Sequence, residues 1–212
     1  MVTIGSCSAD MPTVIQGKTE AEWHAEPDLE ELGAAYALLR VSPANAVSRL
    51  HALAERGSVM SMIYLGDAYA SGKGAIRDLD KAQKWYQQAT DYGSVRAAYI
   101  LGRLYLTLKR YDEARKAFKL AAARDFAPAA HILGRMYWAG TGGEKRIDKA
   151  IEHLEHAADL GSVPARGLLG RILVETHAER GQMMRGLGLL LRACADLVIV
   201  RLVEGARSDR LT

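Results

Sequence analysis

The clearest pattern in the chain is a pair of apolar stripes at helical spacing between residues 101 and 121. Leu101 and Tyr105 are four residues apart and so share one face of a helix. A polar turn at residues 109–110 is followed by a second apolar stripe, which consists of Ala114, Phe118 and Ala121. The pattern predicts two short helices that pack against each other as a hairpin.

The same pattern recurs along the chain at a nearly constant interval. Each copy has a leucine–glycine pair followed three residues later by a tyrosine, or by a leucine in the last copy. The five glycines are Gly33, Gly66, Gly102, Gly134 and Gly170, and their spacings are 33, 36, 32 and 36 residues. A fixed period of this length is typical of stacked helical hairpins. Because one hairpin cannot bury both of its stripes, each should pack against the next, with the glycine allowing close approach of a helix.

Aspartates precede the second helix of three hairpins. Asp80, Asp112 and Asp148 stand two residues before the alanine that begins the apolar stripe. A carboxylate there can accept hydrogen bonds from free helix N–H groups and complements the positive end of the helix dipole. We therefore predict that these aspartates cap their helices.

One unit, residues 57–92 with the glycine that follows, carries the fullest set of markers: Leu65, Gly66, Tyr69, Gly72, Gly74, Asp78, Lys81, Ala82, Trp85, Ala89 and Gly93. This set resembles Sel1-like repeats (SLR), a subgroup of the tetratricopeptide (TPR) solenoids. Residues 126–160 match well, whereas residues 93–125 lack the glycine loop and have the shorter TPR length. The resemblance covers about residues 29–198. It implies an all-α, right-handed α-solenoid superhelix of about five helix-turn-helix repeats.

The pattern divides the chain into three parts. Residues 1–28 have no sustained period and mix small residues with acidic ones, which predicts a mobile or loosely docked N-terminal arm. Trp23 in that arm either seals the first hairpin or anchors a partner or a second copy. Residues 29–198 form the repeat solenoid, and residues 199–212 are expected to be a C-terminal cap or tail.

Composition narrows the class of protein. The 212 residues are 49% hydrophobic and 25% charged, which is ordinary for a globular protein with a sizeable core. A formal net charge of +3 is too small to indicate nucleic-acid binding by itself. Cys7 and Cys194, the two cysteines, lie at opposite ends of the sequence and are expected to be too far apart for a disulfide.

The predicted location is the cytoplasm. No apolar signal segment opens the sequence, and the repeats lack the regular cysteines of some secreted SLR proteins. Residues 4–7 resemble the end of a bacterial lipoprotein signal. The alternative is therefore a periplasmic or lipid-anchored protein whose true start lies upstream of Cys7.

The resemblance also implies a binding surface. In TPR-type stacks the first helix of each hairpin lines the concave side, and the residue after each glycine faces inward. Here that residue is arginine in three consecutive units, and with its neighbours it would form a basic, aromatic-lined groove of Arg96, Tyr99, Arg103, His131, Arg135, Trp138 and Arg171. Guanidinium groups bind carboxylates through paired hydrogen bonds, and aromatic rings supply rigid packing area. The groove would suit an acidic protein or peptide. Alternatively, the arginine stems only cover apolar surface while their charged ends remain in water.

A second predicted surface lies near the C-terminus. Between residues 187 and 203 apolar side chains surround the last predicted helix, and three charged residues interrupt them, which argues against a membrane span. Terminal repeats normally have a polar outer face, so this helix should be covered by folding back or by another chain. The candidate self-association residues, in a possible homodimer, are Leu187, Leu190, Leu191, Leu197 and Val198.

No motif indicates catalysis, a metal or another cofactor. His153 and His156 lie three residues apart, but no third ligand accompanies them, and His153 occupies the position of Trp85 in its own repeat. The glycine-rich residues 140–143 are not followed by the Lys-Ser/Thr pair of a phosphate loop. The sequence therefore predicts a non-catalytic adaptor or scaffold for a protein or peptide partner. The alternative is a self-associating structural or regulatory protein, such as an immunity protein.

Overall fold

The computed structural model describes residues 26–176 and 180–208, and in the second range the side chains of residues 182–198. The predicted arm up to residue 25, with Cys7 and Trp23, lies outside the described residues. So do the side chains and last residues of the predicted cap, from residue 199 onward.

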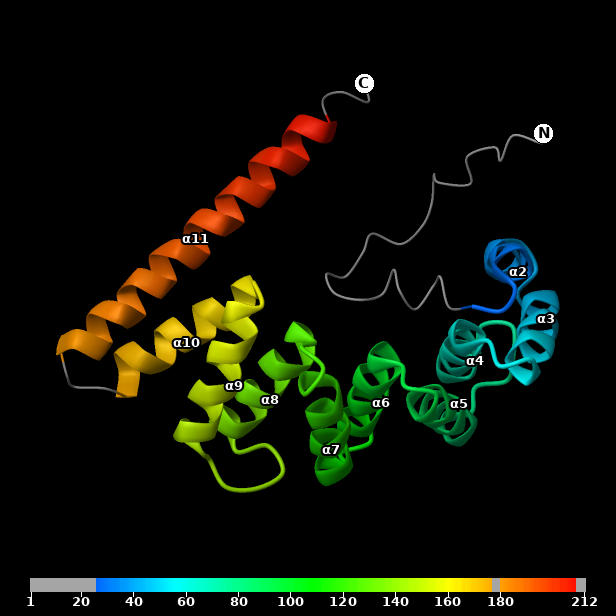
Figure 1. Ribbon diagram of the computed structural model, residues 1–212, viewed down its shortest axis with the longest axis horizontal. Coiled ribbons are helices and arrows are strands. Elements are labelled where there is room, and N and C mark those ends of the chain that lie inside the picture. Colours follow the sequence, from blue (N-terminus) through cyan, green and yellow to red (C-terminus); the bar gives the residue numbers. More distant parts are fainter. Residues whose placement is uncertain (1–25, 177–179, 209–212) are drawn as a thin grey trace. The chain divides into compact units, whose positions relative to one another are not determined.

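The described part of the chain is entirely helical, with ten α-helices and no strand (Figure 1). In order they are α2 (Leu29–Val41), α3 (Pro43–Glu55), α4 (Val59–Ser71), α5 (Leu79–Asp91), α6 (Val95–Thr107), α7 (Tyr111–Ala122), α8 (Ala127–Ala139), α9 (Ile147–Asp159), α10 (Val163–Thr176) and α11 (Arg180–Ser208). Most are 12 to 14 residues long, and each pair of successive helices corresponds to one predicted hairpin. The all-α repeat fold is thus confirmed. The chain packs as two compact units whose boundary lies within α5, between Ala82 and Gln83.

In the first unit, α2 packs on α3 and α3 on α4. Leu32 of α2, Leu50 and Leu53 of α3, and Leu65 of α4 are completely buried. These positions belong to the apolar stripes of the first two hairpins, so the stripes form the core of this unit.

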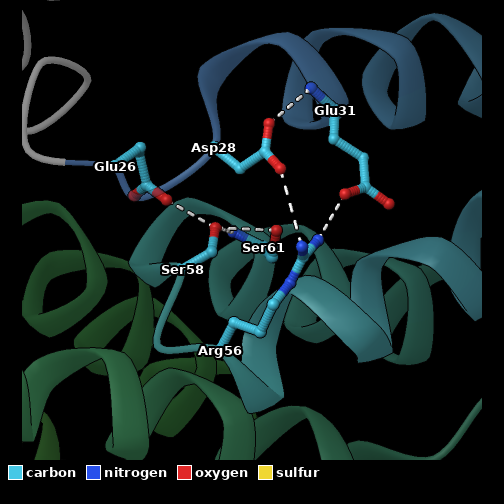
Figure 2. Close-up of polar contacts among 6 residues, drawn as sticks. All are labelled: Glu26, Asp28, Glu31, Arg56, Ser58 and Ser61. Atoms are coloured by element: carbon cyan, nitrogen blue, oxygen red, sulfur yellow. Dashed lines mark hydrogen bonds and ion pairs between the residues drawn. The ribbon is translucent and has the colours of Figure 1, made fainter.

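Polar contacts fix the start of α2 to the turn between α3 and α4 (Figure 2). Ser58 caps α4 by accepting a hydrogen bond from the Ser61 amide at 3.2 Å, and its hydroxyl donates to Glu26. The Glu26 carboxylate also accepts from the Met60 amide at 2.8 Å, which places a negative charge at the positive end of α4. Residue 26, near the end of the predicted arm, is therefore attached to the second hairpin.

Arg56 makes a second link in the same cluster. Its guanidinium pairs with the carboxylate of Glu31 and lies 3.5 Å from that of Asp28 (Figure 2). Asp28 in turn caps α2 by accepting from the Glu31 amide at 3.1 Å. The side chains are more than a third exposed, so these pairs orient α2 and add little stability.

In the second unit, the glycines of the repeat lie where the two helices of a hairpin meet, as predicted. A Cβ on Gly102 of α6 would lie 2.7 Å from the ring of Phe118 in α7. A Cβ on Gly134 of α8 would lie 2.5 Å from Leu154 in α9. The first hairpin differs, because a Cβ on Gly33 would meet nothing within 4 Å. Close helix contact therefore requires glycine in these repeats of the second unit and not in the first repeat.

The prediction that three aspartates cap their helices is wrong. Asp80, Asp112 and Asp148 lie within the first turns of α5, α7 and α9, not at the capping positions. In α5 the capping carboxylate is that of Asp78, which accepts from the amides of Asp80 and Lys81 at 3.1 and 2.9 Å. The reason is that these helices begin one residue before the aspartate, which leaves the favourable interaction with the helix dipole but not the capping geometry.

The last helix is much longer than the others. α11 contains 29 residues and continues across residue 198, where the sequence suggested the end of the solenoid. Within the described residues, no helix combines the length and the apolar character that a membrane crossing requires.

Candidate binding surface on the first helices of the repeats

The residue after each repeat glycine is exposed in every hairpin: Ala34, Asp67, Arg103, Arg135 and Arg171. The three arginines belong to α6, α8 and α10 of the second unit. Their position follows from the register of the first helix, because the glycine before each one faces the second helix of its own hairpin.

On α6, an arginine and an aromatic ring form a pair. Arg103 lies one helical turn after Tyr99, and its guanidinium carbon is 6.0 Å from the centre of the tyrosine ring. Tyr99 is half-buried, and its ring packs 5.9 Å from Phe118 and 5.2 Å from Phe126, measured between ring centres. Phe126 is the residue that immediately precedes α8. The Tyr99 ring is therefore held in place by α7 and by the start of α8. Arg96, half-buried, continues the same stripe of α6.

On α8, the same register carries His131 and Arg135, 32 residues after Tyr99 and Arg103. His131 is half-buried, and Arg135 is exposed. Burial lowers the pKa of the His131 imidazole below its usual range, and the positive charge of Arg135 lowers it further. His131 is therefore a neutral ring at neutral pH, so that this pair, like the one on α6, combines a flat uncharged ring with a guanidinium.

Trp138 extends the α8 stripe by one further turn. The Lys145 ammonium lies 3.6 Å from the centre of its ring, a close cation–π contact. Lys145 was not predicted as part of the surface. It lies in the loop between α8 and α9, where side chains follow no helical period, so no sequence pattern indicates it.

The three arginines differ in their acidic neighbours. Arg171 of α10 lies 3.8 Å from the carboxylate of Glu175, one turn later on the same helix. In the described part of the chain, Arg96, Arg103 and Arg135 form no ion pair with a carboxylate. Among the residues that the structure describes, the guanidinium groups on α6 and α8 thus have no carboxylate partner, whereas the one on α10 has Glu175.

The candidate self-association residues belong to α11. Leu187, Leu191, Leu197 and Val198 are exposed. Leu190 is half-buried and turned toward α10, where a Cβ on Gly170 would lie 2.9 Å from its Cγ. Four of the five residues are therefore at the surface, and Leu190 contributes to the contact between α10 and α11.

The two histidines of α9 have partners that explain them. His153 stacks on Tyr137 with ring centres 5.5 Å apart, and burial lowers the pKa of its imidazole. His156 lies 3.2 Å from the carboxylate of Asp125. Among the described residues no group of three potential ligands could hold a metal ion.

The glycine-rich loop after α8 packs against α7 of the same chain. Arg115 of α7 donates a hydrogen bond to the carbonyl oxygen of Gly142. A Cβ on Gly142 would lie 2.3 Å from that of Tyr111, so the loop packs directly on α7. Its glycines therefore serve the contact between hairpins.

Comparison with known proteins places this arrangement in a family. The model of the Sel1 repeat matches residues 59–94 and 127–162, and that of the tetratricopeptide repeat matches residues 95–128 between them. The chain is a Sel1-type repeat protein. The boundaries agree with the sequence analysis, which assigned the shorter TPR length to the middle repeat.

Solved structures support the same conclusion about the fold of this Sel1-type protein. A Sel1 repeat protein from Oxalobacter formigenes superposes with a TM-score of 0.67 at 20% identity, covering 83% of this chain and 78% of its own. A protective antigen of uropathogenic Escherichia coli with an SLR fold gives 0.68 at 20% identity, covering 78% and 38%. MamA from Desulfovibrio magneticus gives 0.52 at 22% identity, covering 77% and 97%. These identities show a shared helical solenoid fold and nothing further. No curated protein sequence matches the chain.

Proposed function

We propose that this Sel1-type protein is a non-catalytic adaptor that binds an acidic segment of a partner protein on the first helices of its later repeats. Sel1 and tetratricopeptide repeats are generally scaffolds for protein–protein interaction. The binding residues would be Arg96, Tyr99 and Arg103 of α6, with His131, Arg135 and Trp138 of α8 and Arg171 of α10.

The proposal depends mainly on the repeated pair of a ring and an unpaired guanidinium. Tyr99 with Arg103 and His131 with Arg135 stand at the same register of successive first helices. Neither arginine has a carboxylate partner among the described residues, so each guanidinium can donate hydrogen bonds to a carboxylate of a ligand. A guanidinium–carboxylate pair with two hydrogen bonds is stronger than a neutral contact and fixes the orientation of the ligand.

The rings beside the arginines would supply the rest of the affinity. Tyr99 is held between Phe118 and Phe126, and Trp138 has Lys145 against its face. Rings that are already fixed lose little conformational freedom when a peptide packs on them. Binding would therefore be concentrated in a few aromatic and arginine residues, as is common at protein interfaces.

A peptide-display selection tests the proposal directly. Peptides recovered with the purified protein should be enriched in Asp and Glu. The strongest of them would be synthesised with a fluorescent label and titrated against the protein and its variants. Charge reversal in Arg103→Glu with Arg135→Glu should weaken binding at least tenfold.

The matched control reverses two charges on α7, the second helix of the hairpin that contains Arg103. Lys116 and Lys119 of α7 are exposed, and Lys116→Glu with Lys119→Glu changes the net charge equally. Binding should survive in this control, and the helical circular dichroism of both variants should equal that of the parent protein. Equal loss in both double variants, or a selection without acidic peptides, would refute the proposed surface.

A further inference from the structure

The exposed side of α11 carries an apolar stripe with the spacing of a coiled coil. Met184, Leu187, Leu191, Cys194 and Val198 follow one another at intervals of three, four, three and four residues, and all are exposed. Leu191, in the middle, is 73% exposed, and Met184 and Val198 are 59% and 57% exposed. Alternating intervals of three and four residues define the seam along which two helices pack side by side.

The opposite side of α11 is already occupied by α10. A Cβ on Gly170 of α10 would lie 2.8 Å from the carbonyl oxygen of Gly186, so the two helices are in close contact there. Three turns further along α11, the carboxylate of Asp196 pairs with Arg166 of α10 at 2.6 Å, and the Arg166 side chain is only 14% exposed. These contacts fix the rotation of α11 and so keep the stripe at the surface.

The stripe is also free of charge over its described length. The charged residues between Met184 and Val198 are Arg185, Arg192 and Asp196, which lie on other faces of the helix. Arg185 forms an ion pair with Glu155 of α9 at 2.8 Å. An acidic ligand such as the one proposed for α6 and α8 would therefore find no positive charge on this stripe. The partner that covers it has to be an apolar helix.

We propose that this helix is α11 of a second copy of the chain. A heptad seam needs a partner helix with the same spacing of apolar residues, and an identical helix has it by definition, which gives a symmetric, self-complementary dimer. Beside the stripe, a Cβ on Gly188 would meet nothing within 4 Å, and Ala195 stands seven residues later. Small side chains in that column allow the two helix axes to approach closely.

The size of the stripe agrees with such a pair. The five residues, with Met183 and Leu197 beside them, form an exposed apolar surface along one side of a single helix. A pair of single helices buries an area at the lower end of specific interfaces between proteins, about 1,200 Å² in total. The dimer is therefore expected to dissociate reversibly on dilution.

Light scattering coupled to gel filtration tests the proposal. The parent protein should have the mass of a dimer at high concentration, and Leu191→Glu should halve that mass while leaving the helical circular dichroism unchanged. The control is Ile76→Glu, which replaces a more exposed apolar side chain, 91% exposed, in the first unit and should leave the dimer intact. Arg103→Glu with Arg135→Glu should also remain dimeric, which separates this proposal from that of the peptide surface.

A second measurement needs no change in the helix. In a Cys7→Ser protein the remaining thiol is Cys194, which is exposed in the single chain and lies in the seam of the pair. Its rate of labelling by a maleimide should fall as the protein concentration rises. A monomer at every concentration, or a labelling rate that does not change with concentration, would refute the second-copy interface. Protection at all concentrations in a monomer would instead mean that the chain's own segment covers the stripe.

Discussion

Gly102 of α6 lies directly against the ring of Phe118 of α7 at the centre of the middle hairpin. A Cβ on Gly102 would lie 2.7 Å from Cε1 of the phenylalanine, whose side chain is completely buried. The ring thus fills the space that a larger residue at position 102 would need, and the leucine–glycine signature follows from this contact.

Gly102→Ala should destabilise the protein by about 1–3 kcal/mol, because the buried Phe118 ring has to move or the helices have to separate. Gly33→Ala is the matched control. No atom lies within 4 Å of a Cβ there, so alanine should stabilise α2 by up to about 1 kcal/mol through its higher helix propensity. Urea unfolding followed by circular dichroism measures both. Equal effects of the two substitutions would contradict the steric explanation of the repeat glycine.

Lys109→Gly should stabilise the protein. Lys109, between α6 and α7, has a φ of 58°, a left-handed conformation that costs a residue with a Cβ about 1 kcal/mol. Glycine removes this cost but loses more backbone entropy on folding, so the expected gain is about 0.5 kcal/mol. Lys116→Gly, within α7, serves as the control and should lose about 1 kcal/mol. Thermal unfolding of the two variants should shift in opposite directions.

Asp196→Ala should loosen α11 from α10. The substitution leaves the mostly buried guanidinium of Arg166 without its partner, which should lower the free energy of unfolding by about 2–3 kcal/mol. Glu175→Ala breaks the exposed pair with Arg171 and should cost less than about 0.5 kcal/mol. Hydrogen exchange of the α11 amides should rise in Asp196→Ala alone. Unchanged exchange would mean that apolar contacts suffice to hold the helix.

The stability of the protein should fall as the pH drops from 7.5 to 5.5. Burial lowers the pKa values of His131 and His153 in the folded protein, whereas in the unfolded chain they titrate near 6.5. Below that pH the unfolded chain takes up protons that the folded chain resists, so acid favours unfolding. A variant with His131→Gln and His153→Gln should lose less stability between these two pH values. Denaturant titrations of the parent protein and of the variant at both pH values measure this loss of stability. An equal loss in the two proteins would contradict the role of the histidines.

The sequence was sufficient to predict the helical hairpins, because apolar residues recur with the helical period. The position of the arginines on an inner, concave side was implied only by the resemblance to TPR-type stacks, and it stays a prediction. The sequence pattern failed for the aspartates, since a shift of one residue in a helix start separates a cap from a first-turn position.

What the sequence by itself determined is the repeat: its period, its pairs of helices and the residues of its core, because these depend on neighbours within one hairpin. Only the tertiary structure decided which charges pair between separate elements. Arg166 and Asp196 are 30 residues apart in the chain and Trp138 meets a lysine from an irregular loop, contacts that arise when separate elements pack together. The tertiary structure also decided which side of α11 remains exposed, since the helix is apolar on several faces and only its packing on α10 selects the one that is covered.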